Sequence, residues 1–104
     1  MIQYATDETF DALISEGVVL VDFFGKTCVP CKMVARELEE IDDELPFVSI
    51  VKVDTDDCPK LTEKFRINGI PDLYFYKDGK LVHHEVGAID GESIRSILGK
   101  MLYD

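Results

Sequence analysis

The chain has 104 residues and a formal net charge of −10 at pH 7, from 11 Lys and Arg against 21 Asp and Glu. This length allows one domain, over residues 1–104, and leaves no room for a second. Hydrophobic residues make up 46% of the chain, which is ordinary for a globular protein and too high for a disordered acidic tail. The acidic balance argues against binding to nucleic acid or to an anionic membrane surface, because both require clusters of Lys and Arg.

The N-terminus and the cysteine content bear on the compartment. Residues 1–8 lack the basic start and apolar stretch of a secretory signal. The longest aliphatic run, Val18–Val21, is far shorter than the ~20 residues that a membrane span needs. Three cysteines cannot all pair within one chain. We therefore expect a cytoplasmic protein, in which closely spaced cysteines are usually catalytic or metal-binding, although a mature secreted form would have the same features.

The first predicted elements are a short helix and a buried strand. Apolar spacing predicts a helix around Phe10–Ile14 that Thr6 or Asp7 would cap and that Gly17 would end. Val18–Phe24 is nearly continuously apolar and rich in valine, which is typical of a strand buried on both faces of a parallel sheet.

A helix, a strand and a second helix are predicted next. Apolar residues at positions 34, 38, 41 and 45 have helical spacing, and Pro46 would end that helix. Phe47–Val53 has the pattern of a second apolar strand. Asp57 is in place to cap a short helix that continues to Phe65 and carries Pro59 in its first turn.

The last part of the chain predicts a hairpin followed by a helix. Leu73–Lys77 and Lys80–Val86 flank an Asp-Gly pair at positions 78 and 79, which is a strong signal for a two-residue β-turn. A final helix would be capped by Asp90 and bury one stripe of residues 94–102. Ile2–Tyr4 is a further candidate strand. Because the early βαβ units require parallel pairing and the hairpin requires antiparallel pairing, we expect an α/β fold with a mixed sheet flanked by helices.

Two cysteines lie where the buried strand turns into the long helix. Residues at i and i+3 of a helix have Cβ atoms roughly 5–6 Å apart, close enough for Cys28 and Cys31 to form and break a disulfide with little backbone movement. The helix N-terminus favours a thiolate at Cys28, whereas Cys31, about one turn inside, should be more buried and act second. Pro30 suits the first turn, where a missing N–H has no consequence.

Half of a zinc site is the alternative interpretation of two cysteines at this spacing. Structural zinc takes four ligands, usually from a second closely spaced pair. Only Cys58, His83 and His84 remain, and adjacent histidines of a strand point to opposite faces. We therefore favour redox chemistry and expect no metal ion or other cofactor.

Asp22 interrupts the strand that is predicted to be buried. Burial should raise the pKa of such a carboxyl, so that it could take up or release a proton near neutral pH. A structural ion pair, for example with Lys52 of the neighbouring strand, is the alternative. The two interpretations are compatible, and we favour proton transfer during thiol exchange.

Several motifs together resemble the thioredoxin family. They are Val21–Phe24 leading to Cys28–Met33, then Asn68–Pro71, Phe75–Gly79 and Val86–Ala88, in the family's order and spacing over essentially the whole chain. The resemblance implies a thioredoxin fold, with a central mixed sheet and four α-helices. It also implies a protein dithiol–disulfide oxidoreductase that reduces target proteins through a mixed disulfide.

The resemblance assigns roles to individual residues. Cys28 would be the attacking thiol and Cys31 the resolving thiol, and the two would form the reversible Cys28–Cys31 disulfide. Asp22, tuned by Lys52, would be the buried proton acceptor and donor. Residues of the active-site turn, of the cis-proline segment and of the turn that follows the hairpin would border the substrate groove: Val29, Pro30, Ile70, Pro71, Asp72, Gly87 and Ala88.

The resemblance also implies partners. A thioredoxin reductase, dependent on NADPH or on ferredoxin, would return the disulfide to the dithiol. The clients would be disulfide-containing proteins such as ribonucleotide reductase, peroxiredoxin or methionine sulfoxide reductase. We expect the protein to act as a monomer.

Some residues depart from the family's usual pattern. Phe24 and Thr27 stand where tryptophan is common, and Val29 stands where glycine usually separates the cysteines. Arg36 occupies the position of a helix-kinking proline. Asp72 adds a carboxylate expected close to the dithiol, which would oppose the Cys28 thiolate and favour partners with basic rims.

Two further features are weighed separately. Cys58 precedes Pro59 at a predicted helix start, so it is either an adventitious surface or helix-start thiol or an activated thiol with a regulatory role. Residues 37–44 contain six acids, which we interpret as a solvated helix face remote from the dithiol.

Two rival functions remain open. A disulfide oxidase or isomerase could use the same fold, and a measured redox potential decides between it and a reductant. A non-catalytic thioredoxin-like binding module is less expected, because the chain keeps both cysteines together with Asp22 and Pro71.

Overall fold

The computed structural model describes residues 1–103. In chain order its elements are β1 (Ile2–Tyr4), α1 (Phe10–Leu13), β2 (Val18–Phe24), α2 (Val29–Glu44), β3 (Ser49–Asp54), α3 (Pro59–Lys64), β4 (Asp72–Lys77), β5 (Lys80–Val86) and α4 (Gly91–Tyr103). The candidate strand at Ile2–Tyr4 is therefore confirmed, as is the predicted order of the other elements. None of the helices in this part of the chain is long and apolar enough to cross a membrane.

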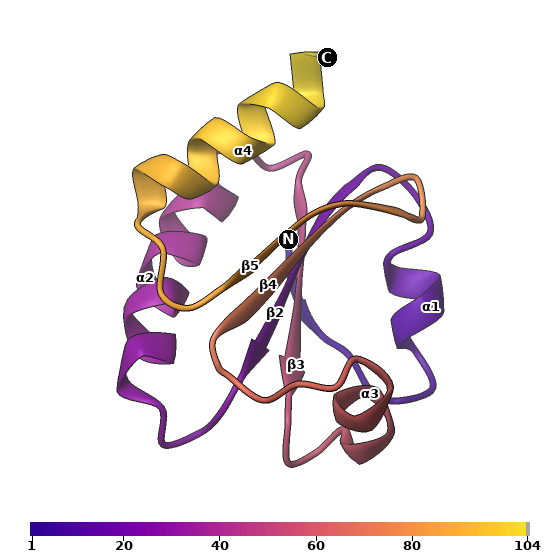
Figure 1. Cartoon of the computed structure of the whole chain (residues 1–104). Helices are drawn as coiled ribbons and strands as arrows, with labels where there is room; N and C mark the ends of the chain where they lie inside the picture. Colours follow the sequence, from indigo (N-terminus) through magenta and orange to yellow (C-terminus); the bar gives the residue numbers. More distant parts are fainter. Residues whose placement is uncertain (104) are drawn as a thin grey trace.

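The strands form one mixed sheet in the order β1-β3-β2-β4-β5. β3 pairs in parallel with both β1 and β2, whereas β4 pairs antiparallel with β2 and with β5. Figure 1 shows α2 and α4 on one side of this sheet and α1 and α3 on the other. The predicted α/β fold with a mixed sheet flanked by four helices is confirmed.

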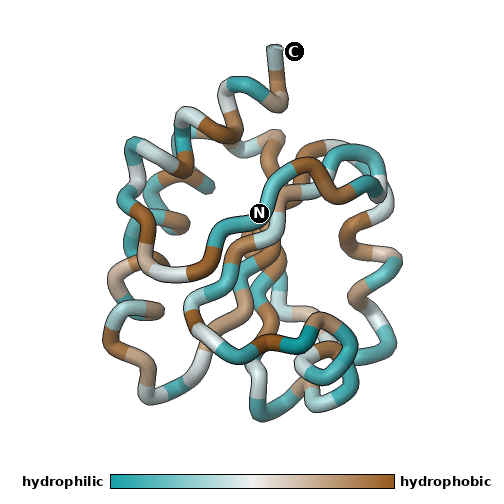
Figure 2. Tube along the Cα trace, viewed as in Figure 1, coloured by the Kyte–Doolittle hydropathy of each residue, from teal (hydrophilic) through white to brown (hydrophobic). Residues whose placement is uncertain are grey.

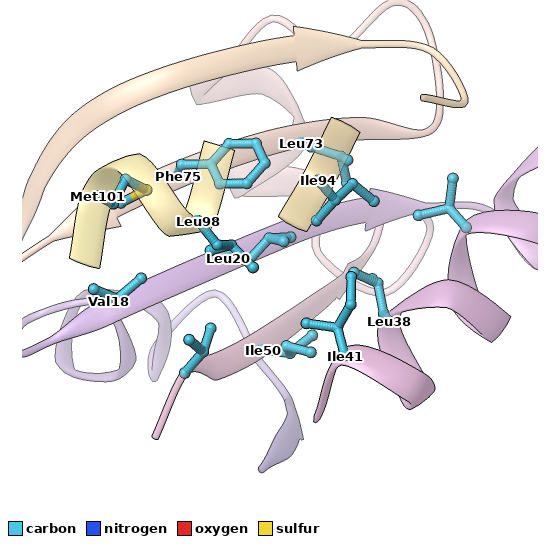
Figure 3. Close-up of a cluster of buried hydrophobic side chains, with 12 residues drawn as sticks. Val18, Leu20, Leu38, Ile41, Ile50, Leu73, Phe75, Ile94, Leu98 and Met101 are labelled. Atoms are coloured by element: carbon cyan, nitrogen blue, oxygen red, sulfur yellow. The ribbon is translucent and has the colours of Figure 1, made fainter. Parts of the chain in front are cut away.

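Each face of the sheet has its own hydrophobic cluster, because successive side chains of a strand point to opposite faces. On β2, Leu20 belongs to the cluster under α2 and α4, whereas Val19 and Val21 belong to the cluster under α1 and α3. Figure 3 shows the first cluster, in which Leu38 and Ile41 of α2 lie near Ile50, Leu20 and residues of α4. Hydrophobic and hydrophilic residues alternate along α4, as expected for a helix with one buried stripe (Figure 2).

The start of β3 differs from the prediction. Phe47 was expected in the strand, but it lies in a turn with 62% of its surface exposed, and β3 begins at Ser49. The amide of Val48 donates to the carbonyl of Leu45 at 3.0 Å, which closes the turn after α2. Phe47 is therefore an exposed apolar residue that precedes the strand and does not take part in strand pairing.

Gly17 does not end α1, which stops at Leu13. It has a φ of +73° and exchanges two hydrogen bonds of 2.9 Å with Asp78, one through its amide and one through its carbonyl. Gly17 thus connects the start of β2 to the turn of the hairpin. Thr6 accepts hydrogen bonds from the amides of Glu8 and Thr9 in the turn before α1. The N-cap position of α1 is Thr9, which makes no capping hydrogen bond through its side chain, so the predicted cap by Thr6 or Asp7 is wrong.

The predicted cap of α3 by Asp57 is wrong. Cys58 occupies the N-cap position, and its side chain makes no capping hydrogen bond. The amide of Leu61 in the first turn instead donates to a carboxylate oxygen of Asp7 at 2.9 Å. A residue 54 positions earlier in the chain therefore supplies the acceptor. At α4 the prediction is confirmed, since Asp90 accepts from the amide of Ser93 at 2.8 Å.

The acidic stretch of α2 is held by one arginine of α4. Arg95 donates to both carboxylate oxygens of Glu44, at 2.8 and 2.9 Å. Its guanidinium also lies 3.5 Å from Glu37 and 3.7 Å from Glu40. This face of α2 is therefore more than a solvated acidic surface, because it connects the two helices.

Candidate active site at the start of α2

The two cysteines of the motif are joined as a disulfide at the N-terminus of α2. Their Cα atoms lie 5.2 Å apart. Cys28 is the N-cap residue, and its sulfur accepts a hydrogen bond from the amide of Cys31 at 3.2 Å. Cys28 is half-buried, whereas Cys31 is only 3% exposed. The predicted difference in burial between the two sulfurs is therefore confirmed.

The cis-proline segment lies directly against Cys28. The Ile70–Pro71 peptide bond is cis, and the carbonyl oxygen of Ile70 lies 3.8 Å from the sulfur of Cys28. The amide of Gly87 donates to the carbonyl of Pro71 at 2.8 Å. A Cβ atom at Gly25 would lie 2.8 Å from the end of the Ile70 side chain, so the two loops approach each other closely here and a larger residue would require the Ile70 side chain to move. The structure thus brings Ile70, Pro71 and Gly87 together beside the dithiol.

Apolar side chains on the first turns of α2 are unusually exposed. Val29 is 66% exposed and Met33 is 61% exposed, and Pro30 between them is also exposed. Ala88, which follows Gly87, is exposed as well. Large apolar side chains in water beside a reactive pair are the kind of surface that a protein partner covers.

Asp22 and Lys52 lie side by side on adjacent strands. They are directly paired in the register of β2 and β3, and the ammonium of Lys52 lies 3.7 Å from Oδ2 of Asp22. Asp22 is fully buried, and within residues 1–103 neither of its carboxylate oxygens has a hydrogen-bond partner. Burial raises the pKa of Asp22 to about 6, and Lys52 offsets only part of this increase. The pKa increase predicted from sequence agrees with this environment.

Cys31 and Lys52 line the same small cavity. It has a volume of about 200 Å³ and contacts the end of β2, the following loop, the start of α2 and β3, being lined by Phe24, Gly25, Lys26, Cys31, Lys32, Ala35 and Lys52. A larger cavity of about 380 Å³ lies between β5 and α4, away from the dithiol. A third cavity of about 250 Å³ is lined by Ile70 and by residues of α3 and its flanking loops, but by neither cysteine. The cavity lined by Cys31 is therefore the one in direct contact with the disulfide.

Asp72 is buried on the opposite face of the sheet from Asp22. Strand alternation places it with Tyr74, on the face covered by α1 and α3. Its Oδ1 lies 2.5 Å from Nε2 of His84, whose ring stacks on Tyr74 with 4.1 Å between centroids. Burial raises the pKa of Asp72, and His84 partly counteracts the increase. The carboxylate of Asp72 faces His84. The expected destabilisation of the Cys28 thiolate by Asp72 stays a prediction, and this geometry does not favour it.

His83 and His84 point to opposite faces, as predicted. His84 contacts Tyr74 on one face, whereas His83 packs edge-on against Phe75 on the other, with 5.6 Å between ring centroids. His83 also lies 2.9 Å from a carboxylate oxygen of Glu85.

Cys58 is neither exposed nor activated. It is 1% exposed, and its thiol donates to the carbonyl of Ala5 at 3.4 Å. Burial raises the pKa of this thiol, and the nearby carboxylates of Asp7 and Asp57 raise it further. The surface thiol and the activated thiol are therefore wrong, because the residues before α3 pack against the residue that follows β1. The helix-start position agrees with the prediction, since Cys58 is the N-cap residue of α3.

Two ion pairs beside the active site were not predicted from the sequence, and both involve Lys26. Lys26, two residues before Cys28, places its ammonium 2.8 Å from Asp54 and 3.2 Å from Asp57. Asp54 also accepts hydrogen bonds from the amides of Asp56 and Asp57. This cluster connects the active-site loop to the loop after β3. The lysine at position 26 and the aspartates within residues 54–57 were visible in the sequence, but nothing in the chain order shows that the two loops meet.

A disulfide at a helix start, with one half-buried and one buried cysteine beside a cis-proline, defines the protein as a dithiol–disulfide oxidoreductase. A family model described as Thioredoxin matches residues 1–100. The chain belongs to the thioredoxin family, whose members reduce protein disulfides. It therefore acts on disulfide-containing proteins and is itself reduced by a reductase.

Three relatives cover nearly the whole chain. Thioredoxin of Chlamydia trachomatis is 42% identical over 100 residues, which span 96% of this chain and 98% of that protein. Thioredoxin of Bacillus subtilis is 42% identical over 99 residues, which span 94% of this chain and 95% of that protein. Thioredoxin of Listeria monocytogenes is 40% identical over 101 residues, which span 96% of this chain and 98% of that protein.

Proposed function

We propose that Cys28 attacks and Cys31 resolves in the reduction of client disulfides, with Asp22 as the proton acceptor for Cys31. The observation that carries this proposal is the unequal burial of the two sulfurs, since only Cys28 reaches the surface beside the cis-proline. The cavity that Cys31 shares with Lys52, which in turn faces Asp22, supports the proton step.

The reaction proceeds in two exchanges from the dithiol form. The Cys28 thiolate attacks one sulfur of the client disulfide, which forms a mixed disulfide and releases the other client sulfur as a thiolate. Cys31 then transfers its proton to Asp22, and its thiolate attacks the sulfur of Cys28. The Cys28–Cys31 disulfide forms, the second client thiolate leaves, and two electrons have moved to the client. The client thiolates become thiols by taking up protons, one of them from Asp22.

The groove residues have a separate role in this proposal. Val29 and Pro30 offer apolar contact, and Ile70 offers its backbone to an extended client segment beside Pro71. Gly87 and Ala88 border the same groove, which the hydrogen bond from Gly87 to Pro71 supports. Asp72 contributes through its position next to Pro71, with its carboxylate turned to His84.

A protein-disulfide reduction assay tests the roles of the two cysteines. Cys28→Ser should abolish turnover, because no other exposed thiol is available within residues 1–103. Cys31→Ser should accumulate the mixed disulfide. Cys58→Ala is the matched control and should keep its activity. Undiminished turnover by Cys28→Ser would overturn the assignment.

We further propose the finer identity of the partners. The reductase is a thioredoxin reductase, dependent on NADPH or on ferredoxin, and the clients include ribonucleotide reductase, peroxiredoxin or methionine sulfoxide reductase, in line with the family. Residues 1–104 act as one monomeric domain in the cytosol, where a free thiol such as that of Cys58 stays reduced. Incubating Cys31→Ser with a host extract and identifying the disulfide-linked proteins tests the client set, with Cys28→Ser, which should capture none of them, as the control.

A further inference from the structure

Lys52 lies between a carboxylate and two aromatic rings. Its ammonium is 3.7 Å from Oδ2 of Asp22 and 4.6 Å from the centroid of the Phe24 ring. The Tyr4 ring centroid is 6.0 Å away, and the two rings meet edge to face at 6.1 Å. The ammonium is thus beyond hydrogen-bond distance of Asp22 while it lies over the face of Phe24.

We propose that Phe24 and Tyr4 are positioning residues that hold the Lys52 ammonium back from Asp22, and so set how strongly it stabilises the charged carboxylate. The inference rests on the proposed role of Asp22 for its catalytic meaning. The arrangement itself is a property of the folded chain that can be measured without any client.

The sheet register builds this arrangement from three neighbouring strands. Tyr4 of β1 is paired with Lys52 of β3, which is paired with Asp22 of β2, so the three residues form one row across the sheet. Phe24 follows Asp22 by two positions and therefore projects from the same face of β2. The N-terminal strand, far from the cysteines in sequence, thereby reaches the proton-transfer site.

The rings and the carboxylate compete for one positive charge. The negative face of an aromatic ring attracts an ammonium, and this attraction strengthens where water is excluded. Lys52 is 8% exposed, so it has little water to replace either partner. If the ring is lost, the ammonium is free to move closer to Asp22, and the carboxylate becomes easier to ionise.

Within residues 1–103, Lys52 is the charged group that pairs with Asp22. Lys26, from the loop before α2, has its ammonium at 2.8 Å from Asp54. From α2, Cys31 and the exposed Lys32 line the cavity that Lys52 also lines. From β4, the residue paired with Asp22 is the apolar Leu73. Lys52 is therefore the charged group whose position matters most to Asp22.

The inference predicts shifts of opposite sign for two substitutions at one position. Phe24→Leu keeps apolar bulk but removes the ring, so the pKa of Asp22 should fall by roughly 0.5. Phe24→Trp supplies the ring that binds cations best, so the pKa of Asp22 should rise. A general loosening of the site would shift both variants in the same direction.

NMR titration of the Asp22 carboxyl carbon in the dithiol form measures these shifts directly. Tyr4→Leu should lower the pKa by less than Phe24→Leu, because its ring is farther from the ammonium. Tyr103→Leu removes a ring that is 87% exposed and serves as the control without effect. In a Lys52→Met background, Phe24→Leu should no longer change the titration. An unchanged pKa in Phe24→Leu, or shifts of the same sign in Phe24→Leu and Phe24→Trp, would overturn the inference.

The pH dependence of the resolving step separates this inference from the proposed function. Release of a client from the mixed disulfide should follow the altered titration of Asp22 in both Phe24 variants. If the titration moves and the pH profile of release does not, the positions of the rings and Lys52 are supported, while the proton-transfer role of Asp22 is wrong.

Discussion

Asp22 and Asp54 are two buried carboxylates on neighbouring strands with opposite surroundings. Asp22 is completely buried and, within the described residues 1–103, accepts no hydrogen bond. Asp54 is 6% exposed and accepts from two backbone amides as well as pairing with Lys26. Burial raises the pKa of Asp22 to about 6. Burial also acts to raise the pKa of Asp54, but the hydrogen bonds from Lys26 and the amides outweigh it and lower that pKa.

The comparison separates a carboxylate that exchanges protons from one that holds loops together. A buried charge without hydrogen bonds destabilises the fold, so its presence calls for a functional reason. A buried charge with three donors contributes to the fold instead. Sequence alone shows an aspartate at the end of an apolar strand in both cases, and the difference lies in which loops come to meet each side chain.

Removing the carboxylate of Asp22 should give the largest change in stability. The shift of its pKa from 3.8 to about 6 means that folding disfavours the charged form by about 3 kcal/mol. Asp22→Ala should therefore raise the free energy of unfolding at pH 8 by about 2–3 kcal/mol, less a small loss of packing. The same variant should release clients from the mixed disulfide more slowly.

The sign of this effect follows from proton binding. Between pH 4 and pH 6 the folded protein holds a proton on Asp22 that the unfolded chain has released, so the stability of the unmodified protein falls as the pH rises through this window. The gain from Asp22→Ala should vanish below about pH 4. Urea unfolding at both ends of the window measures it, and a gain that is equal at both pH values would contradict the assignment.

Asp54→Asn should have the opposite effect on stability. The lowered pKa of Asp54 means that its charged form stabilises the fold above its unfolded value of 3.8, and that this contribution is lost as the pH falls through the folded value. The variant should lose about 1–2 kcal/mol near neutral pH, because the acceptor of two loop amides and an ion pair are weakened. The loss should shrink in acid. Urea unfolding of Asp56→Asn, which changes an exposed neighbour, provides the control.

His84→Phe should give the smallest of these changes. Phenylalanine keeps an aromatic ring against Tyr74 and removes the partner of Asp72, so the pKa of Asp72 should rise further above its usual range. We expect a loss of about 0.5–1 kcal/mol at neutral pH that disappears when Asp72 is protonated. NMR titration of Asp72 checks this expectation. His83→Phe, on the other face, should leave the titration as it is.

The fold could be predicted almost entirely from local patterns. Val18–Phe24 and the Asp-Gly turn at 78–79 carry the two signals, a buried strand and a hairpin, that together require a mixed sheet. The depth of Cys31 relative to Cys28 also followed from their positions in the first turn of a helix. These features depend on spacing along the chain, and spacing is what a sequence contains.

Contacts between distant segments could not be predicted in the same way. Asp7 caps α3, Lys26 pairs with Asp54, and Cys58 is covered by the end of β1. Each contact depends on which loops meet after folding. The local sequence does not show which of several nearby acidic residues would make it. The charge of Asp72 illustrates the limit, because its position in sequence next to Pro71 does not show which face its side chain occupies.

Arg95 and the three glutamates that it contacts make the two halves of α2 differ in how they are attached to α4. The half that carries Glu37, Glu40 and Glu44 is fastened to α4 by one guanidinium, and a Cβ at Gly91 would collide with Glu37, so the two helices are in close contact there. In the described part of the chain, no ion pair joins the first turn of α2, next to Cys28, to α4. When the Cys28–Cys31 disulfide opens and closes, we therefore expect the first turn of α2 to adjust. The later turns of α2 should keep their position against α4.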